Sequence, residues 1–328
     1  MTMTTMIADP VLAEGLPEEL PMPEVFKAPE FLNKDLKAAA LMLSRDQARF
    51  LVEEYYRYQR QRIASAAQVR EADKAGKPSR AVAWVADTWE TMEKNIQKML
   101  GLWAAQWTVG AWMQAQVGIG PVISAGLLAH LDIRKSKTCG HFWRFAGLDP
   151  TQVWEKKQKR PWNAALKTLC AFKLGECFVK TCSNKNAFYG PLYRQYKDAL
   201  LVRNEQGKFA ERAAKILSEK TFKAKPGDDA EQAYKSAVTW YGEGKLPPAH
   251  IHAMARRQAV KMFLSHLHEV MYRDYFGQAP PVPYIFTKAG EDHRHFIAPP
   301  LWPMAKPGRS LTEMLPPLPP INEAEEAE

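Results

Sequence analysis

The sequence predicts an all-α protein, in which a long helical hairpin or coiled coil is followed by a helical domain containing a helix-hairpin-helix. Apolar residues recur at helical spacing over several long stretches, which is typical of amphipathic helices. No alternating run of useful length indicates a strand. The segment Gly118-Ile119-Gly120-Pro121 has the composition of a tight turn that leads directly into a helix.

The composition points to a polyanionic partner. The 328 residues carry a net charge of +9, and 46% of them are hydrophobic, as expected for a globular chain with one large or two modest domains. Four cysteines are too few for a disulfide scaffold of this size. There is no secretory signal pattern and no run of about 18 apolar residues. We therefore expect a cytoplasmic, nucleoid-associated protein with reduced thiols and no membrane partner.

The two ends of the chain are rich in proline. We expect residues 1–43 to form a flexible arm, because residues 1–30 contain five prolines among scattered acidic residues. Residues 278–328 contain several prolines and end in glutamates, which predicts a disordered tail.

Residues 44–106 predict the long helical hairpin. Ser44 is suited to cap the first helix, and Ser79 the second. The Gly-Lys-Pro sequence at 76–78 separates the two helices. Helices of this length often pair between chains, so we expect a homo-oligomer that forms through them.

Residues 107–277 predict the helix-hairpin-helix domain. Within it, 162–182 is expected to be one buried helix and 203–248 a loosely packed insertion. An amphipathic helix is predicted over 250–276, and Gly277 is expected to end it.

The turn at residues 118–120 predicts a site for a phosphate. Gly118 and Gly120 permit positive φ angles, and Ile119 between them can anchor the turn in the core. Pro121 suits the first helical turn, while the small Ala125 allows the two helices to approach closely. The glycine amides and the helix N-terminus would then offer donors to a phosphate oxygen, which positions a duplex without reading its sequence. The alternative is an ordinary connection between two helices that binds nothing.

A basic segment follows the turn. Between Arg134 and Lys173 there are ten Lys or Arg residues and only two acidic ones, and tryptophans interleave with them. The residues that we expect to contact nucleic acid are Gly118, Ile119, Gly120, Arg134, Lys135, Lys137, Arg144, Lys156, Lys157, Lys159 and Arg160. The alternative for such a segment is a solvated surface loop.

Several stretches resemble a known family. They are Val117-Gly118-Ile119-Gly120-Pro121, Leu127-Leu128-Ala129-His130-Leu131, Phe145-Ala146-Gly147-Leu148-Asp149-Pro150 and Asn163-Ala164-Ala165-Leu166-Lys167. In this order they resemble the C-terminal domain of DEDD-type insertion-sequence transposases of the 110/116/902 group, which are related to Piv-like DNA invertases. The resemblance covers roughly residues 45–276. It implies duplex DNA as the partner, and a role in transposition or recombination within a mobile element.

The sequence departs from that family where the chemistry would occur. The family begins with a ribonuclease-H-like domain whose carboxylates hold metal ions, and residues 1–45 contain no apolar strand ending in aspartate. The family's serine nucleophile lies in a Gly-rich stretch, but residues 151–157 contain neither Ser nor Gly. Thr151, which has a hydroxyl, is a weak candidate to replace this serine as the nucleophile. We therefore assign no catalytic residue and expect no cofactor, with Mg²⁺ required only if the protein is an active enzyme.

The histidines and cysteines predict no metal site. His266 and His268 are two residues apart on a helix, so their side chains point about 200° apart and cannot chelate one ion. Cys170 and Cys177 share a helical face and are expected in the core. The leading hypothesis is a DNA-binding protein that grips the nucleic-acid backbone. An active transposase or recombinase, a helical protein-interaction adaptor and a partner made of structured RNA are the alternatives.

Overall fold

The computed structural model describes residues 31–219, 237–282 and 296–318. These residues form helices joined by loops, and no strand occurs among them apart from one isolated bridge between Trp107 and Arg309. The predicted all-α class is confirmed. None of the helices in the described ranges is long and apolar enough to cross a membrane.

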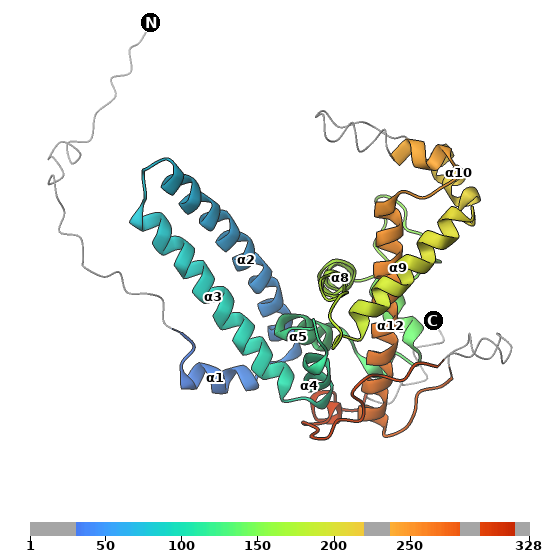
Figure 1. Cartoon of the computed structure of the whole chain (residues 1–328). Coiled ribbons are helices and arrows are strands. Elements are labelled where there is room, and N and C mark those ends of the chain that lie inside the picture. The colour runs from blue at the N-terminus through green and yellow to red at the C-terminus, as the bar shows by residue number, and fades with distance from the viewer. Residues whose placement is uncertain (1–30, 220–236, 283–295, 319–328) are drawn as a thin grey trace, which may run out of the picture.

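Two long helices, α2 (Arg45–Lys74) and α3 (Arg80–Ala105), run antiparallel along most of their length (Figure 1). Ser44 caps α2 in a reciprocal box with Gln47, and the Ser79 hydroxyl accepts from Val82 at the start of α3. Gly76 has a φ of +68° in the break between them. The local capping and turn signals therefore set these boundaries as predicted.

The base of this helical pair is packed and its far end is polar or exposed. Val52, Ile96 and Leu100 are buried near the base. Farther out, the Arg62 guanidinium donates to the buried Glu93 carboxylate over 2.5 Å. Self-association through the exposed apolar side chains of this region, among them Trp84, stays a prediction.

The expected flexible arm ends earlier than residue 43. Helix α1 (Lys34–Leu41) packs on α3, and the Leu32 amide donates to the Asn95 side chain over 3.1 Å. Leu32 and Ala40 are buried, and these two side chains supply the apolar contact that holds residues 32–43 in place. Residues 1–30 of the expected arm lie outside the described residues.

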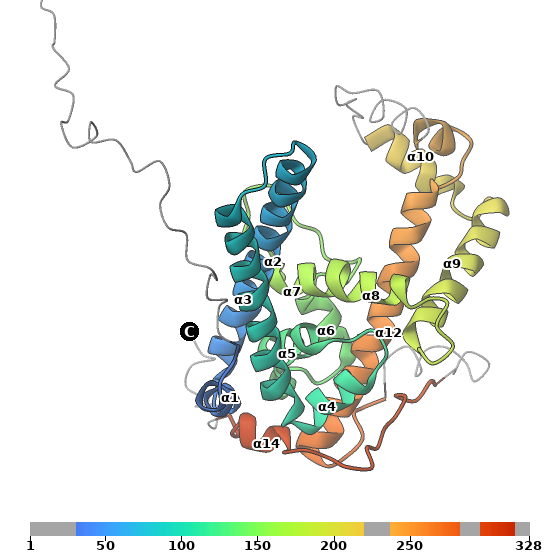
Figure 2. The ribbon, with the colours of Figure 1, turned by 60° about the vertical axis from the view of Figure 1, so that its left-hand side comes forward.

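The second half of the chain is built around one long helix. Its elements are α4 (Thr108–Ala115), α5 (Pro121–His130), η2 (Ile133–Lys135), α6 (Cys139–Phe145), α7 (Ala164–Thr168), η3 (Leu169–Leu174), α8 (Gly175–Lys180), α9 (Tyr189–Glu205), α10 (Ala210–Glu219), α12 (Pro248–Phe276) and α14 (Leu311–Met314). Helix α12 carries most of the core contacts, with α4 and α14 near one end and α10 near the other (Figure 2). Gly277 ends it with a φ of +66°, as predicted.

Helix α5 is tied to the long helices at its C-terminal end. Arg45, the first residue of α2, donates to the Leu128 carbonyl over 3.2 Å and to the Leu131 carbonyl over 2.6 Å. These carbonyls are left free by the helix end, and a cation there also complements the helix dipole. Val122 through Ala129 are all buried, so α5 forms the junction between the long helices and the rest of the protein.

The predicted helix over 162–182 is interrupted. It consists of α7, the π-helical segment η3 and α8, and the wider π turn changes which side chains face the core. Leu169, Leu174 and Phe178 are buried as expected, whereas Phe172 is 56% exposed. The expectation that 162–182 forms one buried helix is therefore wrong at the π-helical segment and at Phe172.

The expected insertion at 203–248 is closed at its base. Asn204 is buried and its side chain pairs with the Leu246 backbone, donating over 3.0 Å and accepting over 2.8 Å. This pair fixes both ends of the segment, so the base is more firmly packed than the polar composition suggests. Residues 220–236 lie outside the described residues.

The expected disordered tail is packed over residues 296–318. The Trp112 indole donates to the Pro300 carbonyl over 2.8 Å, and the Arg309 amide donates to the Gln106 carbonyl over the same distance. Leu311 and Leu315 are buried against the core. Disorder is the wrong expectation for this part, because hydrogen bonds to Trp112 and Gln106 and the burial of two of its leucines hold it against the core. Residues 283–295 and 319–328 lie outside the described residues.

Candidate nucleic-acid interface

The turn between α4 and α5 has a positive φ at Gly118 but not at Gly120, where φ is −89°. Gly118 has a φ of +96°, and the Ile119 amide donates to the Gln116 carbonyl over 3.0 Å. The Ile119 side chain is 4% exposed, so it anchors the turn in the core and is not available to a ligand. Within the described residues the Gly118 and Gly120 amides have no hydrogen-bond acceptor. Gly120 precedes Pro121, the first residue of α5, at the positive end of the helix dipole.

The two glycines have different roles. A Cβ atom at Gly118 would lie 3.1 Å from the Thr181 Cγ2 atom, and the backbone there is in a region that side chains rarely adopt. A Cβ atom at Gly120 would meet nothing within 4 Å, and the φ of −89° suits any residue. Gly118 therefore shapes the turn, while Gly120 keeps its outer surface open.

Gly118→Ala is expected to lower the free energy of unfolding by about 1–3 kcal/mol, because of backbone strain and the contact with Thr181. Gly120→Ala is the matched control and should change stability by less than about 0.5 kcal/mol. Urea unfolding followed by circular dichroism measures both. Equal stability of the two variants would show that the turn lacks the described conformation.

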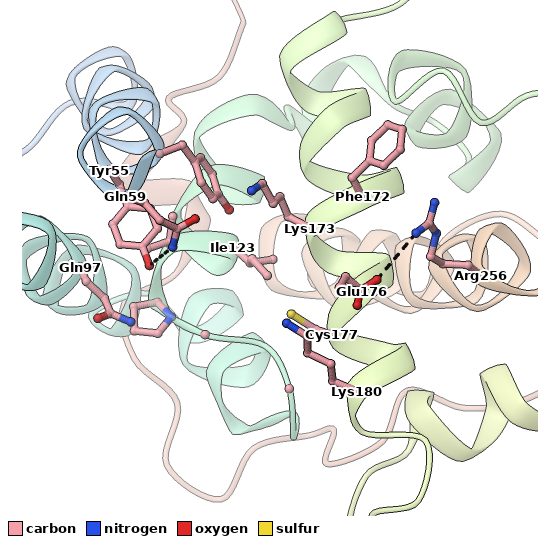
Figure 3. A pocket seen from close by; sticks show the side chains of 15 residues that line it. Tyr55, Gln59, Gln97, Ile123, Phe172, Lys173, Glu176, Cys177, Lys180 and Arg256 are labelled. Atoms are coloured by element: carbon pink, nitrogen blue, oxygen red, sulfur yellow. Dashed lines mark hydrogen bonds and ion pairs between the residues drawn. The ribbon is translucent and has the colours of Figure 1, made fainter. Parts of the chain in front are cut away.

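A cleft of 570 Å³ lies directly beside this turn, between the α2–α3 pair and the η3–α8 segment (Figure 3). The residues that line it are Tyr55, Tyr56, Gln59, Gln97, Gly118, Gly120, Pro121, Val122, Ile123, Phe172, Lys173, Glu176, Cys177, Lys180 and Arg256. The turn supplies backbone donors, α2 supplies aromatic rings, and η3, α8 and α12 supply charged side chains.

The cleft is positively charged. Lys173, Lys180 and Arg256 line it, and Glu176 is the one carboxylate among the described residues that do so. The Lys173 ammonium lies 4.4 Å from the centre of the Tyr56 ring. Neither lysine forms an ion pair with a described residue, so both ammonium groups are available to an anion.

Arg256 is held at the edge of the cleft by two weak contacts. Its guanidinium lies 3.8 Å from the Glu176 carboxylate and 5.4 Å from the centre of the Phe172 ring. Its Nε atom is buried and has no hydrogen-bond partner among the described residues. An anion that entered the cleft could therefore compete for this guanidinium.

The predicted cations near the end of α5 do not reach the cleft. Arg134 donates to both oxygens of Asp132, over 2.9 and 2.6 Å, and to the Pro316 carbonyl. Burial raises the pKa of Asp132, but the hydrogen bonds and charge of Arg134 outweigh this and leave the pKa lowered. Lys135 and Lys137 are exposed beyond the far end of α5, which is about 15 Å long. Arg144 lies near Asp149, at 3.9 Å.

The basic loop before α7 forms a separate cluster. Lys156, Lys157, Lys159 and Arg160 are exposed and line no part of the cleft. The Arg160 guanidinium lies 5.3 Å from the Trp154 ring centre. These side chains are therefore available to a ligand only on the protein surface outside the cleft.

Electrostatic repulsion couples the cations between this loop and the cleft residue Arg256. Burial lowers the pKa of Lys167, and the charges of Arg160 and Arg257 lower it further. The pKa of Arg257 is lowered by burial and then by Arg212 and Arg256. Repulsion of this kind requires proximity, so we call Arg160, Lys167, Arg257 and Arg256 the cationic strip. It ends at the cleft, because Arg256 belongs to both.

Thr151 forms hydrogen bonds with the neighbouring Asp149. Its hydroxyl donates to the Asp149 carboxylate over 2.7 Å, and its amide donates to the same oxygen over 2.9 Å. These bonds close an exposed turn outside the cleft, and they lower the pKa of Asp149.

The histidines of α12 contact protein groups. The His266 ring bonds the Tyr189 hydroxyl and the Ile297 carbonyl, each at 2.8 Å, and His268 bonds the Ser136 carbonyl at 2.8 Å. Within the described ranges, no group of three or more His, Cys, Asp or Glu side chains could hold a metal ion. The four cysteines are free thiols.

Sequence reasoning counted Lys173 in the basic segment but did not place it, Lys180 or Arg256 at the turn. One signal was present, since Lys173, Glu176, Cys177 and Lys180 follow the 3, 4 spacing of a helix face. That face points at the glycine turn only because the end of α8 lies beside it, so that a Cβ atom added at Gly118 would meet Thr181. Comparison of the chain with protein-family models, with curated proteins and with solved structures finds no match.

Proposed function

We propose that this chain binds nucleic acid through the phosphate backbone, with the cleft beside the α4–α5 turn and the cationic strip as the contact surface. The observation that carries the proposal is the convergence of free turn amides with Lys173, Lys180 and Arg256. Backbone amides at a helix N-terminus bind phosphate oxygens, and lysines neutralise the surrounding charge. Contacts of this kind grip a strand without reading its bases.

Duplex DNA is the partner that we propose, in agreement with the resemblance to insertion-sequence transposases. The glycine turn of that resemblance is one wall of the cleft. We assign only binding to the cleft and the cationic strip, and we assign none of their groups to strand cleavage. A role in transposition or recombination would therefore consist of holding DNA.

Lys173→Gln with Lys180→Gln is expected to weaken binding to a fluorescent DNA duplex by roughly tenfold or more at low salt. The slope of log K against log salt concentration should fall by about 2, close to one unit for each phosphate contact removed. Fluorescence anisotropy over a salt series measures both quantities, and an RNA duplex of the same sequence tests the choice of DNA.

The matched control removes the same two charges elsewhere. Lys34 on α1 and Lys77 at the end of the long helices are both exposed, and neither lines the cleft. Lys34→Gln with Lys77→Gln should leave affinity and slope nearly unchanged. Wild-type binding by the Lys173 and Lys180 variant, or equal losses in the two double variants, would rule out the cleft as the contact surface.

A further inference from the structure

We propose that the cleft receives one unpaired nucleotide, with its phosphate at the Gly118–Gly120 turn and its base against Phe172. This inference rests on the proposed function and names the form of nucleic acid that the same site prefers. The protein would then bind a duplex with an unpaired end, or a locally opened strand, more tightly than a fully paired duplex.

The size of the cleft favours an unpaired nucleotide. Its volume of 570 Å³ lies within the range of about 300–1,000 Å³ that is typical of small-ligand pockets. The bases of a duplex are stacked and paired inside the helix, so only its backbone could touch the rim. A nucleotide that has left the stack can enter with its base.

The lining contains aromatic surface that backbone binding does not require. Phe172 is 56% exposed, although a large apolar ring is normally buried. The Arg256 guanidinium lies 5.4 Å from the centre of the ring, so a cation adjoins this aromatic surface at the edge of the cleft. Bases stack on such rings with little preference for sequence. The ring therefore suits the base of a nucleotide, and the cations of the lining suit its phosphate.

The wall opposite the η3–α8 segment offers polar groups to a nucleotide. Gln59 and Gln97 come from the two long helices and lie across the cleft from η3 and α8 (Figure 3). The Gln59 amide nitrogen donates to Tyr55 over 3.2 Å and to Glu93 over 3.1 Å, which fixes the side chain. Its carbonyl oxygen accepts no hydrogen bond from a described residue. Amide side chains of this kind can pair with the edges of exposed bases.

The experiment compares three probes that share one DNA duplex. The first is blunt, the second carries a short unpaired overhang, and the third carries an overhang of the same length without bases. We expect the overhang with bases to bind roughly tenfold tighter than the other two in fluorescence anisotropy. Phe172→Leu should abolish this preference while blunt-duplex affinity is kept, and Phe172→Tyr should restore it.

Phe188→Leu serves as the control, because Phe188 is a partly exposed aromatic residue outside the cleft. An RNA overhang of the same sequence, and a free 5′-mononucleotide used as competitor, identify the source of the nucleotide. Tighter binding of the mononucleotide than of any overhang would overturn the strand assignment. Equal affinity for all three probes, with a steep salt dependence, would overturn this inference and leave the proposed function standing. No binding to any probe would overturn both.

Discussion

Replacing Trp112 by alanine is expected to lower the free energy of unfolding by about 3–5 kcal/mol. The side chain is fully buried in α4 and stacks on Phe263 of α12, with ring centres 5.9 Å apart. Its indole also donates to the Pro300 carbonyl. The substitution therefore leaves a cavity between two helices and removes one anchor of residues 296–318.

Two measurements check this expectation. Urea unfolding gives the change in stability, and limited proteolysis should show faster cleavage within residues 296–318. Trp84→Ala is the matched control, because Trp84 is 43% exposed on α3, and it should cost less than about 1 kcal/mol. If both tryptophan variants lost the same stability, the packing of the C-terminal segment on α4 would be wrong.

Acidification is expected to destabilise the protein before its carboxylates titrate. Burial lowers the pKa of His266 to about 4, and the hydrogen bond to the Ile297 carbonyl only partly offsets it. Because the folded pKa lies below the unfolded value of about 6.5, the unfolded chain takes up the proton first. Stability is therefore fully present above about pH 6.5 and falls as the pH drops toward the folded pKa. The expected loss from His266 alone is about 2 kcal/mol between pH 7 and pH 5.

A second buried histidine acts in the same direction. The pKa of His130, at the end of α5, is also lowered to about 4, by burial and then by Arg49 and Arg45. Asp132 has a lowered pKa, so its stabilising contribution is lost only below the usual carboxylate range. Unfolding midpoints at neutral and mildly acidic pH measure the loss. His266→Gln should reduce the dependence and leave the part that comes from His130, whereas His141→Gln, at an exposed position, should leave it nearly unchanged. A wild-type stability that is constant over this range would contradict the buried, neutral state of His266.

The sequence predicted those features that depend on neighbouring residues. Ser44, Ser79 and Gly277 act within one helical turn, so their capping roles can be read directly from local patterns. The packing of residues 296–318 depends on a bond between Trp112 and Pro300, which are far apart in sequence. Proline-rich composition favours disorder when no partner is known, and here the partner of the Pro300 carbonyl is the indole of Trp112, which the composition of the segment does not reveal.

The candidate interface was predicted only in part for the same reason. The conformation at Gly118 follows from its neighbours, and it was expected. The basic residues were grouped by their closeness in sequence, but helix α5 separates Lys135 and Lys137 from the turn. Lys180 and Arg256 come from helices that only the fold brings to the cleft.

The π-helical segment η3 has a consequence for the direction of the charges that follow it. A π turn holds about one residue more than an α turn, and one additional residue rotates everything after it by about 100°. The segment thus sets the angular phase between Lys167, whose ammonium lies over the Trp162 ring, and Lys180, which lines the cleft. Deleting one residue would restore regular helical spacing and swing the α8 charges away from the turn. The direction of these charges is therefore fixed by a residue count, which side-chain substitutions leave unchanged.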